Sequence, residues 1–175
     1  PQDKNVLALD LLNQNLESVP TEIKDYQKLR MLFLNGNKLK TLPPEIADLA
    51  TLEQLYIGDN LIEQIPSTFA KLPNLLMLDW TGNQLQNLPA ELFNLNHLRT
   101  LELKYNQLTG IAPEIAKLKT LESLDLSHNQ LHALPAQIGE LSKLSWLNGS
   151  HNQLKELPKG ISMLNQLGWL DLSQN

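Results

Sequence analysis

The chain has 175 residues, a formal net charge of -5 and no cysteine. Its length fits one domain, and its acidic balance argues against nucleic acid or an anionic membrane surface as partner, because both favour basic footprints. No apolar run approaches the roughly 18 residues that a membrane-spanning helix needs, so membrane insertion is not expected.

An asparagine position recurs every 23 residues along the whole chain, without insertion or deletion, and Gln14 takes the slot one period before the first asparagine. The recurring residues are Asn37, Asn60, Asn83, Asn106, Asn129, Asn152 and Asn175. A fixed period of this size indicates stacked units, none of which can bury its apolar face alone. The period therefore predicts a solenoid and directs the search for function to a surface rather than a cleft.

Each repeat changes its apolar spacing halfway along. In the repeat that begins at Leu121, Leu124 and Leu126 alternate with Asp125, which is the pattern of a half-exposed strand. By the period, strands are expected in chain order at residues 9–11, 32–34, 55–57, 78–80, 101–103, 124–126, 147–149 and 170–172. From Leu131 the spacing becomes three, which is typical of a turn and a short helical or 3₁₀ segment. Strands that all run in one direction form a parallel sheet, and bulkier connections behind it bend the stack so that the sheet is concave.

The repeated asparagine is expected to pair backbone groups where the chain leaves each strand. Buried N–H and C=O groups must be paired, and an amide side chain offers two donors and an acceptor to its own and the adjacent repeat. The predicted structural ladder consists of Asn37, Asn60, Asn83, Asn106, Asn129 and Asn152. In most repeats a proline follows the last leucine, as Pro135 does, where its fixed φ suits a non-helical segment.

This pattern of leucines, asparagine and Leu-Pro resembles the leucine-rich repeat family, in the 23-residue type found in bacterial and Ras-group intracellular repeat proteins. The resemblance covers residues 6–175, with seven complete repeats and the start of an eighth. It implies an α/β solenoid with a parallel β-sheet on its concave face and short helical, 3₁₀ or extended segments on its convex face. It also implies protein binding through the concave face, without catalysis or a cofactor.

Residues 1–175 are expected to form a single leucine-rich repeat domain, because no linker or composition shift interrupts the repeat. The sequence stops at Asn175, halfway through a repeat, with no capping segment. Since an uncapped solenoid exposes its core, we interpret the chain as a fragment that lacks its C-terminal cap. Cover of the open end by a partner or a second copy is the alternative, and a monomer is the favoured state.

Outward positions align into columns that cross the expected strands, with neighbours about 4.8 Å apart. The candidate partner-binding residues on this face are Met31, Phe33, Tyr56, Met77, Asp79, Glu102, Tyr105, Asp125, Trp146, Asn148, Trp169 and Asp171. Aromatic and apolar side chains dominate toward the N-terminus, and carboxylates flanked by two tryptophans dominate toward the C-terminus. Exposed aromatics are typical of binding hot spots, and an acidic stripe favours a basic partner. The alternative is that the aromatics serve cross-strand packing and the aspartates belong to the repeat consensus.

Two inward positions depart from the frame. Trp80 fills a leucine slot, which requires local repacking. Gly149 fills another, and the loss of a buried leucine costs a few kcal/mol unless neighbours collapse into the gap, with Trp146 or Trp169 as candidates. The functional alternative is that Gly149 lets a ligand or a backbone approach closely.

No catalytic, cofactor or metal site is expected. His128 and His151 share a column, but two histidines do not complete a zinc site. Asp79, Glu102 and Asp125 could be mistaken for catalytic carboxylates, yet an open sheet has no water-excluding pocket to tune their pKa values.

The leading hypothesis is a non-catalytic recognition module for a protein or peptide partner with basic character. Two alternatives stay open: a targeting or regulatory domain of a larger enzyme of the GTPase or ubiquitin ligase type, and a self-associating scaffold. The cysteine-free frame suits a cytoplasmic protein, or a secreted one if the chain is bacterial. No sequence feature names the partner.

Overall fold

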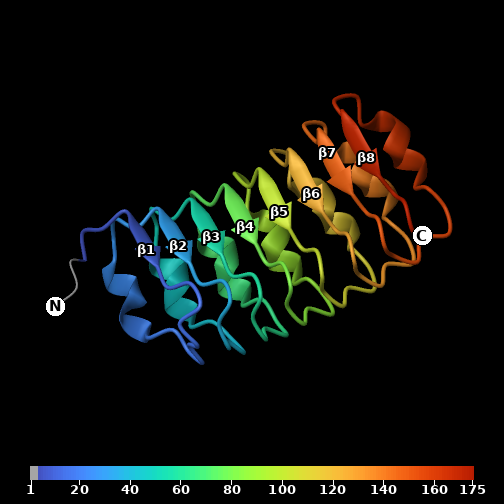
Figure 1. The fold of residues 1–175 in the computed structure, drawn as a ribbon. Coiled ribbons are helices and arrows are strands. Elements are labelled where there is room, and N and C mark those ends of the chain that lie inside the picture. Colours follow the sequence, from blue (N-terminus) through green and yellow to red (C-terminus); the bar gives the residue numbers. More distant parts are fainter. Residues whose placement is uncertain (1–3) are drawn as a thin grey trace.

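A computed structural model describes residues 4–175, in which the chain winds through one coil per repeat (Figure 1). Eight strands form one parallel sheet in which each strand is hydrogen-bonded to the next in chain order. The strands are β1 (Ala8–Asp10), β2 (Met31–Phe33), β3 (Gln54–Tyr56), β4 (Met77–Asp79), β5 (Thr100–Glu102), β6 (Ser123–Asp125), β7 (Trp146–Asn148) and β8 (Trp169–Asp171). The sheet lines the concave side of a curved solenoid, as the sequence predicts.

Each strand begins and ends one residue earlier than the alternating leucines predict. The second inward leucine still bonds to the next strand, as Leu34 does through its N–H to the carbonyl of Tyr56 at 2.7 Å. The chain then turns away, so this leucine lies just outside the regular ladder. The register equals the sequence period, because each residue pairs with the one 23 positions later, as Asp79 does with Glu102. The outward columns read from the sequence are therefore real rows across the sheet.

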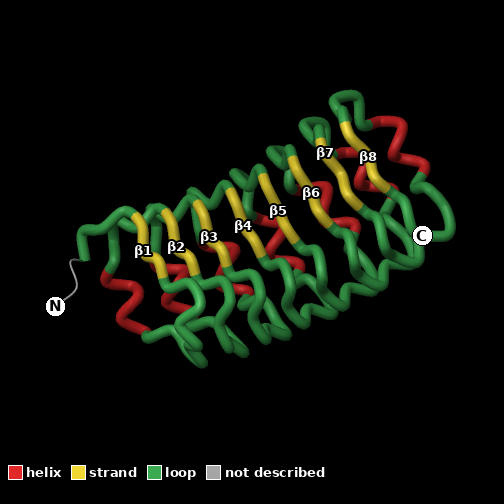
Figure 2. The backbone as a smooth tube through the Cα atoms, viewed as in Figure 1, coloured by secondary structure: helices red, strands yellow, loops and turns green. Residues whose placement is uncertain are grey.

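Seven 3₁₀ helices of five residues stack behind the sheet (Figure 2). They are η1 (Thr21–Asp25), η2 (Pro44–Asp48), η3 (Ser67–Lys71), η4 (Ala90–Asn94), η5 (Pro113–Lys117), η6 (Ala136–Glu140) and η7 (Lys159–Met163). An extended residue precedes each helix, usually a proline such as Pro135, with φ -65° and ψ 145°. In η5 the proline is displaced by one position, and Ala112 takes the same conformation, with φ -71° and ψ 150°. None of the helices in residues 4–175 has the length or the apolar character needed to cross a bilayer.

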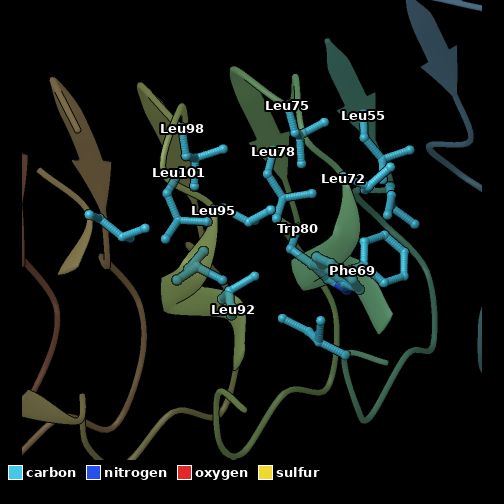
Figure 3. Close-up of a cluster of buried hydrophobic side chains, with 14 of the residues drawn as sticks. Leu55, Phe69, Leu72, Leu75, Leu78, Trp80, Leu92, Leu95, Leu98 and Leu101 are labelled. Carbon is cyan, nitrogen blue, oxygen red and sulfur yellow. The ribbon is translucent and has the colours of Figure 1, made fainter. Parts of the chain in front are cut away.

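The core lies between the sheet and the helices, and inward leucines of both layers fill it (Figure 3). Trp80 is completely buried, and its ring meets Phe69 of η3 edge to face, with centroids 5.5 Å apart. The larger tryptophan is thus packed against an aromatic ring where neighbouring repeats have isoleucine or leucine in the helix. The indole N–H of Trp80 has no hydrogen-bond partner within residues 4–175, which costs stability because the group is desolvated.

Gly149 is compensated by leucines rather than by tryptophan. A Cβ atom at this glycine would lie 2.9 Å from Cδ2 of Leu172 and 3.7 Å from Cδ1 of Leu154, so two leucine tips already occupy the space. The prediction that Trp146 or Trp169 fills the gap is wrong, because these side chains point from the opposite face of the sheet and stack on each other. The short leucine branches reach the gap from the inward side, where the rings cannot.

The repeated asparagines form a continuous ladder along one edge of the sheet. In Asn106, Nδ2 donates to the carbonyls of Trp80 at 2.9 Å and Leu103 at 3.0 Å, and Oδ1 accepts the N–H of Leu85 at 3.0 Å. The same set of bonds, to the previous repeat and to its own, recurs at Asn37, Asn60, Asn83, Asn129, Asn152 and Asn175. In the first repeat, Gln14 instead donates locally to the carbonyl of Leu12. Each ladder asparagine therefore pairs backbone groups of two successive coils.

Candidate functional site on the concave face

Four outward residues of β2, β3 and β4 form an aromatic patch: Met31, Phe33, Tyr56 and Met77. The rings of Phe33 and Tyr56 are register partners on adjacent strands and stack with centroids 4.8 Å apart at 10°. The hydroxyl of Tyr56 donates to Oε1 of Gln54 at 2.9 Å, which holds the ring over the sheet. All four side chains are half-buried, so each keeps apolar surface that water contacts.

Three acidic residues on the next strands form a carboxylate row, made of Asp79 on β4, Glu102 on β5 and Asp125 on β6. Asp171 is not continuous with this row, because Asn148 of β7 separates it from Asp125. Burial, together with the negative charges of Asp125 and Asp79, raises the pKa of Glu102 to about 7, although Lys104 opposes the shift. Near neutral pH the Glu102 carboxyl group is therefore only partly ionised, and a nearby positive charge would favour its ionised form.

The aspartates also have a structural role that sequence reasoning missed. Oδ1 of Asp79 accepts the N–H of Thr81 at 2.9 Å, and Oδ1 of Asp125 accepts that of Ser127 at 2.8 Å. The same bond, from the backbone two residues on, occurs at Asp10, Asn148 and Asp171. We call these bonds Asx caps. They pair an N–H group that the sheet ladder leaves free at the strand exit. The recurring Asp-x-Ser/Thr spacing was the available signal, since short side chains of this kind bond two residues on.

An open hollow of about 520 Å³ lies on this face between the aromatic patch and the C-terminal tryptophans. Its lining includes Asn35, Gly58, Met77, Glu102, Lys104 and Trp146, together with the two aspartates of the carboxylate row. The hollow thus brings apolar, acidic and backbone groups from several repeats to one place. The hollow therefore combines apolar contact surface with negative charge.

Two tryptophans form a second aromatic pair near the C-terminal end. Trp146 and Trp169 stack with centroids 4.7 Å apart at 8°, and Trp169 is 43% exposed. Asp171 follows on the same strand, and hydrogen bonding by Ser173 lowers the pKa of its carboxyl group. The C-terminal candidates therefore lie together, and Trp146 alone of them lines the hollow.

Tyr105 lies apart from the other aromatic candidates. It follows β5 in a turn with φ +55°, and its ring stacks on His128, with centroids 4.2 Å apart. His128 in turn stacks on His151 at 4.1 Å and 11°. Burial and the neighbouring His151 lower the pKa of His128.

The histidine stack is not arranged as a chelating pair. The lone pairs of parallel imidazoles lie in the planes of their rings and do not converge on one point, so stacking disfavours a shared metal ion. Within residues 4–175, no three or more histidine or acidic side chains gather where they could hold a metal ion.

Comparison with known families gives two matches that cover most of the chain. The family described as "Leucine-rich repeat region" matches residues 81–175, and the family described as "Leucine rich repeat" matches residues 27–85. No curated protein sequence matches the chain significantly.

Solved structures with the same architecture come from bacteria and plants. A leucine-rich repeat protein of Leptospira interrogans is 32% identical, with a TM-score of 0.64 over 97% of this chain and 55% of its own. The plant peptide hormone receptor RGFR1, in complex with RGF2, is 27% identical, with a TM-score of 0.80 over 90% of this chain and 26% of its own. A TDR receptor is 38% identical, with a TM-score of 0.79 over 87% of this chain and 28% of its own. The chain thus spans about half of the first structure and little more than a quarter of the other two.

Proposed function

This chain belongs to the leucine-rich repeat family, and from that premise we propose that it is a non-catalytic recognition module whose concave sheet binds an extended, basic segment of a protein or peptide. The observation that carries this proposal is the stacked, half-buried pair of Phe33 and Tyr56 beside an open hollow lined by carboxylates. The similarity to a plant peptide hormone receptor supports a peptide or protein as partner.

The aromatic pair supplies the expected anchor. Phe33 and Tyr56 already stack on each other, so little side-chain freedom remains to be lost when a partner covers them. Aromatic side chains are enriched among hot spots, where truncation commonly costs about 2 kcal/mol or more. We therefore expect Tyr56→Ala to weaken binding by at least about tenfold.

The carboxylate row supplies charge selection. Asp79, Glu102 and Asp125 stand on consecutive strands, and Lys104 is the one cation among the residues that line the hollow. A lysine or arginine of the partner placed over the row would gain complementary charge and speed association. Because the hollow is open to solvent, this contribution should weaken as salt rises and the Debye length shrinks below about 8 Å, and least at Asp125, which is only 5% exposed.

The proposal is tested by selecting random decapeptides, displayed on phage, against the immobilised protein. The tightest decapeptide is then synthesised and titrated by calorimetry into wild type, Tyr56→Ala and Met163→Ala. Met163 is a matched control, because it is an exposed apolar residue of η7 on the opposite side. We expect a basic decapeptide whose affinity falls at least about tenfold with Tyr56→Ala and stays unchanged with Met163→Ala. Equal affinity for wild type and a folded Tyr56→Ala variant would exclude the aromatic patch as the site.

A further inference from the structure

The central column of the concave face contains two kinds of residue. At Asp10, Asp79, Asp125, Asn148 and Asp171, a short side chain accepts the backbone N–H two residues on, at distances of 2.8–3.0 Å. At Phe33, Tyr56 and Glu102, no such bond forms. A phenyl or phenol ring cannot accept it in this way, and the glutamate side chain is one methylene longer. Three repeats therefore lack the Asx cap.

The uncapped repeats leave three backbone donors without a partner. The N–H groups of Asn35, Gly58 and Lys104 make no hydrogen bond to any group in residues 4–175. In the capped repeats the equivalent N–H points toward the concave face, since it meets an outward side chain there. Because the repeats share one register, the three free donors point the same way. Backbone donors are normally paired by protein, water or ligand, so on an open face these three are available to a bound partner.

Two of the free donors lie on adjacent repeats beside the aromatic patch. Asn35 and Gly58 both line the hollow, and Gly58 is buried. Nδ2 of Asn35 donates to Oδ2 of Asp79 at 3.1 Å, while its Oδ1 is buried without a partner. The corner between β2, β3 and β4 thus contains unpaired donors and an unpaired acceptor next to stacked rings. A peptide carbonyl is an acceptor for such donors, so it matches this corner, whereas the buried Oδ1 of Asn35 offers no contact to a partner.

The negative charges near this corner favour a neutral acceptor over a charged one. An Oδ2 atom of Asp79 stands 3.3 Å from the point where a Cβ atom of Gly58 would lie, and Glu102 is on the next strand. A carboxylate of the partner would be repelled by these groups, whereas a neutral carbonyl would not. A basic side chain that follows this carbonyl would meet the carboxylate row.

We propose that the main chain of the partner docks at this corner, with a backbone carbonyl of an extended, basic peptide accepting hydrogen bonds from the N–H groups of Asn35 and Gly58. This inference rests on the proposed function and adds the mode of recognition. The aromatic patch then holds the neighbouring side chain of the peptide. Recognition of this kind depends on the peptide backbone as well as on the sequence of side chains.

Two variants of one residue separate the free donor from the ring above it. Tyr56→Asn places an amide that can form the Asx cap on the Gly58 N–H, as Asn148 does for Ser150 at 3.0 Å. Tyr56→Gln carries the same amide one methylene further out, as Glu102 carries its carboxylate, and leaves that N–H free. Both variants lose the ring of Tyr56, so the difference between their affinities for the peptide reports the contribution of the Gly58 N–H alone. Amide exchange of Gly58, followed by NMR, verifies that the Asn variant is capped and the Gln variant is not.

The probe is the decapeptide recovered by phage selection, N-acetylated and C-amidated, and also prepared with a thioamide at each position in turn. A thioamide sulfur is a poorer acceptor than a carbonyl oxygen. We expect the Gln variant to bind the probe about fivefold more tightly than the Asn variant, which is the effect of one net hydrogen bond. We also expect a thioamide at one position of the peptide to lower its affinity for the wild-type protein by a similar factor.

Three results would overturn one idea or both. Equal binding to the Asn and Gln variants, with both weaker than wild type, would refute backbone docking and keep the proposed function. A thioamide scan without any position that costs more than about twofold would refute backbone docking as well, even if both variants bind too weakly to compare. Decapeptides that bind independently of Tyr56 would exclude the aromatic patch as the site of the proposed function and would refute this inference as well.

Discussion

Replacing Asn106 by alanine tests whether the asparagine ladder stabilises the solenoid through backbone pairing. Asn106 is 8% exposed, and within residues 4–175 its Oδ1 is the one hydrogen-bond acceptor for the Leu85 N–H, at 3.0 Å. Alanine leaves this donor buried and unpaired. The desolvation penalty of an orphaned group is about 1–3 kcal/mol.

The two carbonyl groups that Asn106 contacts lose less hydrogen bonding, because each also accepts a hydrogen bond from the asparagine of a neighbouring repeat. The carbonyl of Trp80 also accepts Nδ2 of Asn83 at 3.3 Å, and that of Leu103 also accepts Nδ2 of Asn129 at 3.0 Å. Both therefore keep one partner when Asn106 is lost. We expect one orphaned donor and weakened acceptors, for a total loss of about 2 kcal/mol in the free energy of unfolding.

The assay is urea unfolding, followed by tryptophan fluorescence and by circular dichroism. With a denaturant dependence of about 2 kcal/mol per M, the midpoint of Asn106→Ala should fall by about 1 M. Gln107→Ala is the control, because this exposed neighbour makes no side-chain hydrogen bond to residues 4–175. A midpoint for Asn106→Ala that equals the control would refute the backbone-pairing account.

Two further predictions concern single positions. Because the pKa of Glu102 is raised from its ordinary value of 4.5 to about 7, the folded state binds the proton more tightly, and stability falls as pH rises through this range. The free energy of unfolding of Glu102→Gln, relative to wild type, should therefore rise by about 1 kcal/mol from pH 4 to pH 8, after allowance for solvent screening. Urea unfolding at both pH values measures it, and a difference from wild type that is the same at pH 4 and pH 8 would contradict this prediction. Gly139→Ala should lose about 2 kcal/mol in thermal or urea unfolding, because its Cβ would lie 2.1 Å from the carbonyl oxygen of Gly160, a backbone atom that cannot rotate away. Gly110→Ala is the control, since no atom lies within 4 Å of a Cβ there, and equal losses in the two variants would argue against the clash.

The regular features of this molecule follow from the sequence because a strict period makes every repeat a copy of the next. Once Leu124 and Leu126 identify one strand, the register places the others, and the structure departs from these ranges by one residue. The concave columns were predictable for the same reason. The contacts between particular side chains of neighbouring repeats were not predictable, because they depend on the distance between two successive coils. The close approach of Gly139 and Gly160, and the filling of the Gly149 slot by Leu172, depend on that spacing.

At the candidate site, too, the sequence shows which residues face outward but not which hydrogen bonds they form. The sequence identifies Asp79 and Asp125 as outward acidic residues, but it does not show which way the backbone N–H points where each strand ends. That direction decides that Oδ1 of each aspartate caps the chain, while Oδ2 of Asp79 accepts a hydrogen bond from Nδ2 of Asn35 at 3.1 Å. Their conserved spacing within the chain is therefore explained by folding alone, and it does not by itself require a partner.

The Asx cap does not explain Phe33, Tyr56 and Glu102. At each of them the repeat gives up an Asx cap that five other positions keep, and a backbone donor is left unpaired within residues 4–175. An aspartate at each position would cap the N–H, but at Phe33 and Tyr56 it would also remove the stacked pair of rings. The three uncapped N–H groups, those of Asn35, Gly58 and Lys104, thus lie around one hollow. We propose that Phe33, Tyr56 and Glu102 serve recognition at that hollow, because the rings, the uncapped glutamate and the unpaired backbone donors all offer contacts to a bound partner.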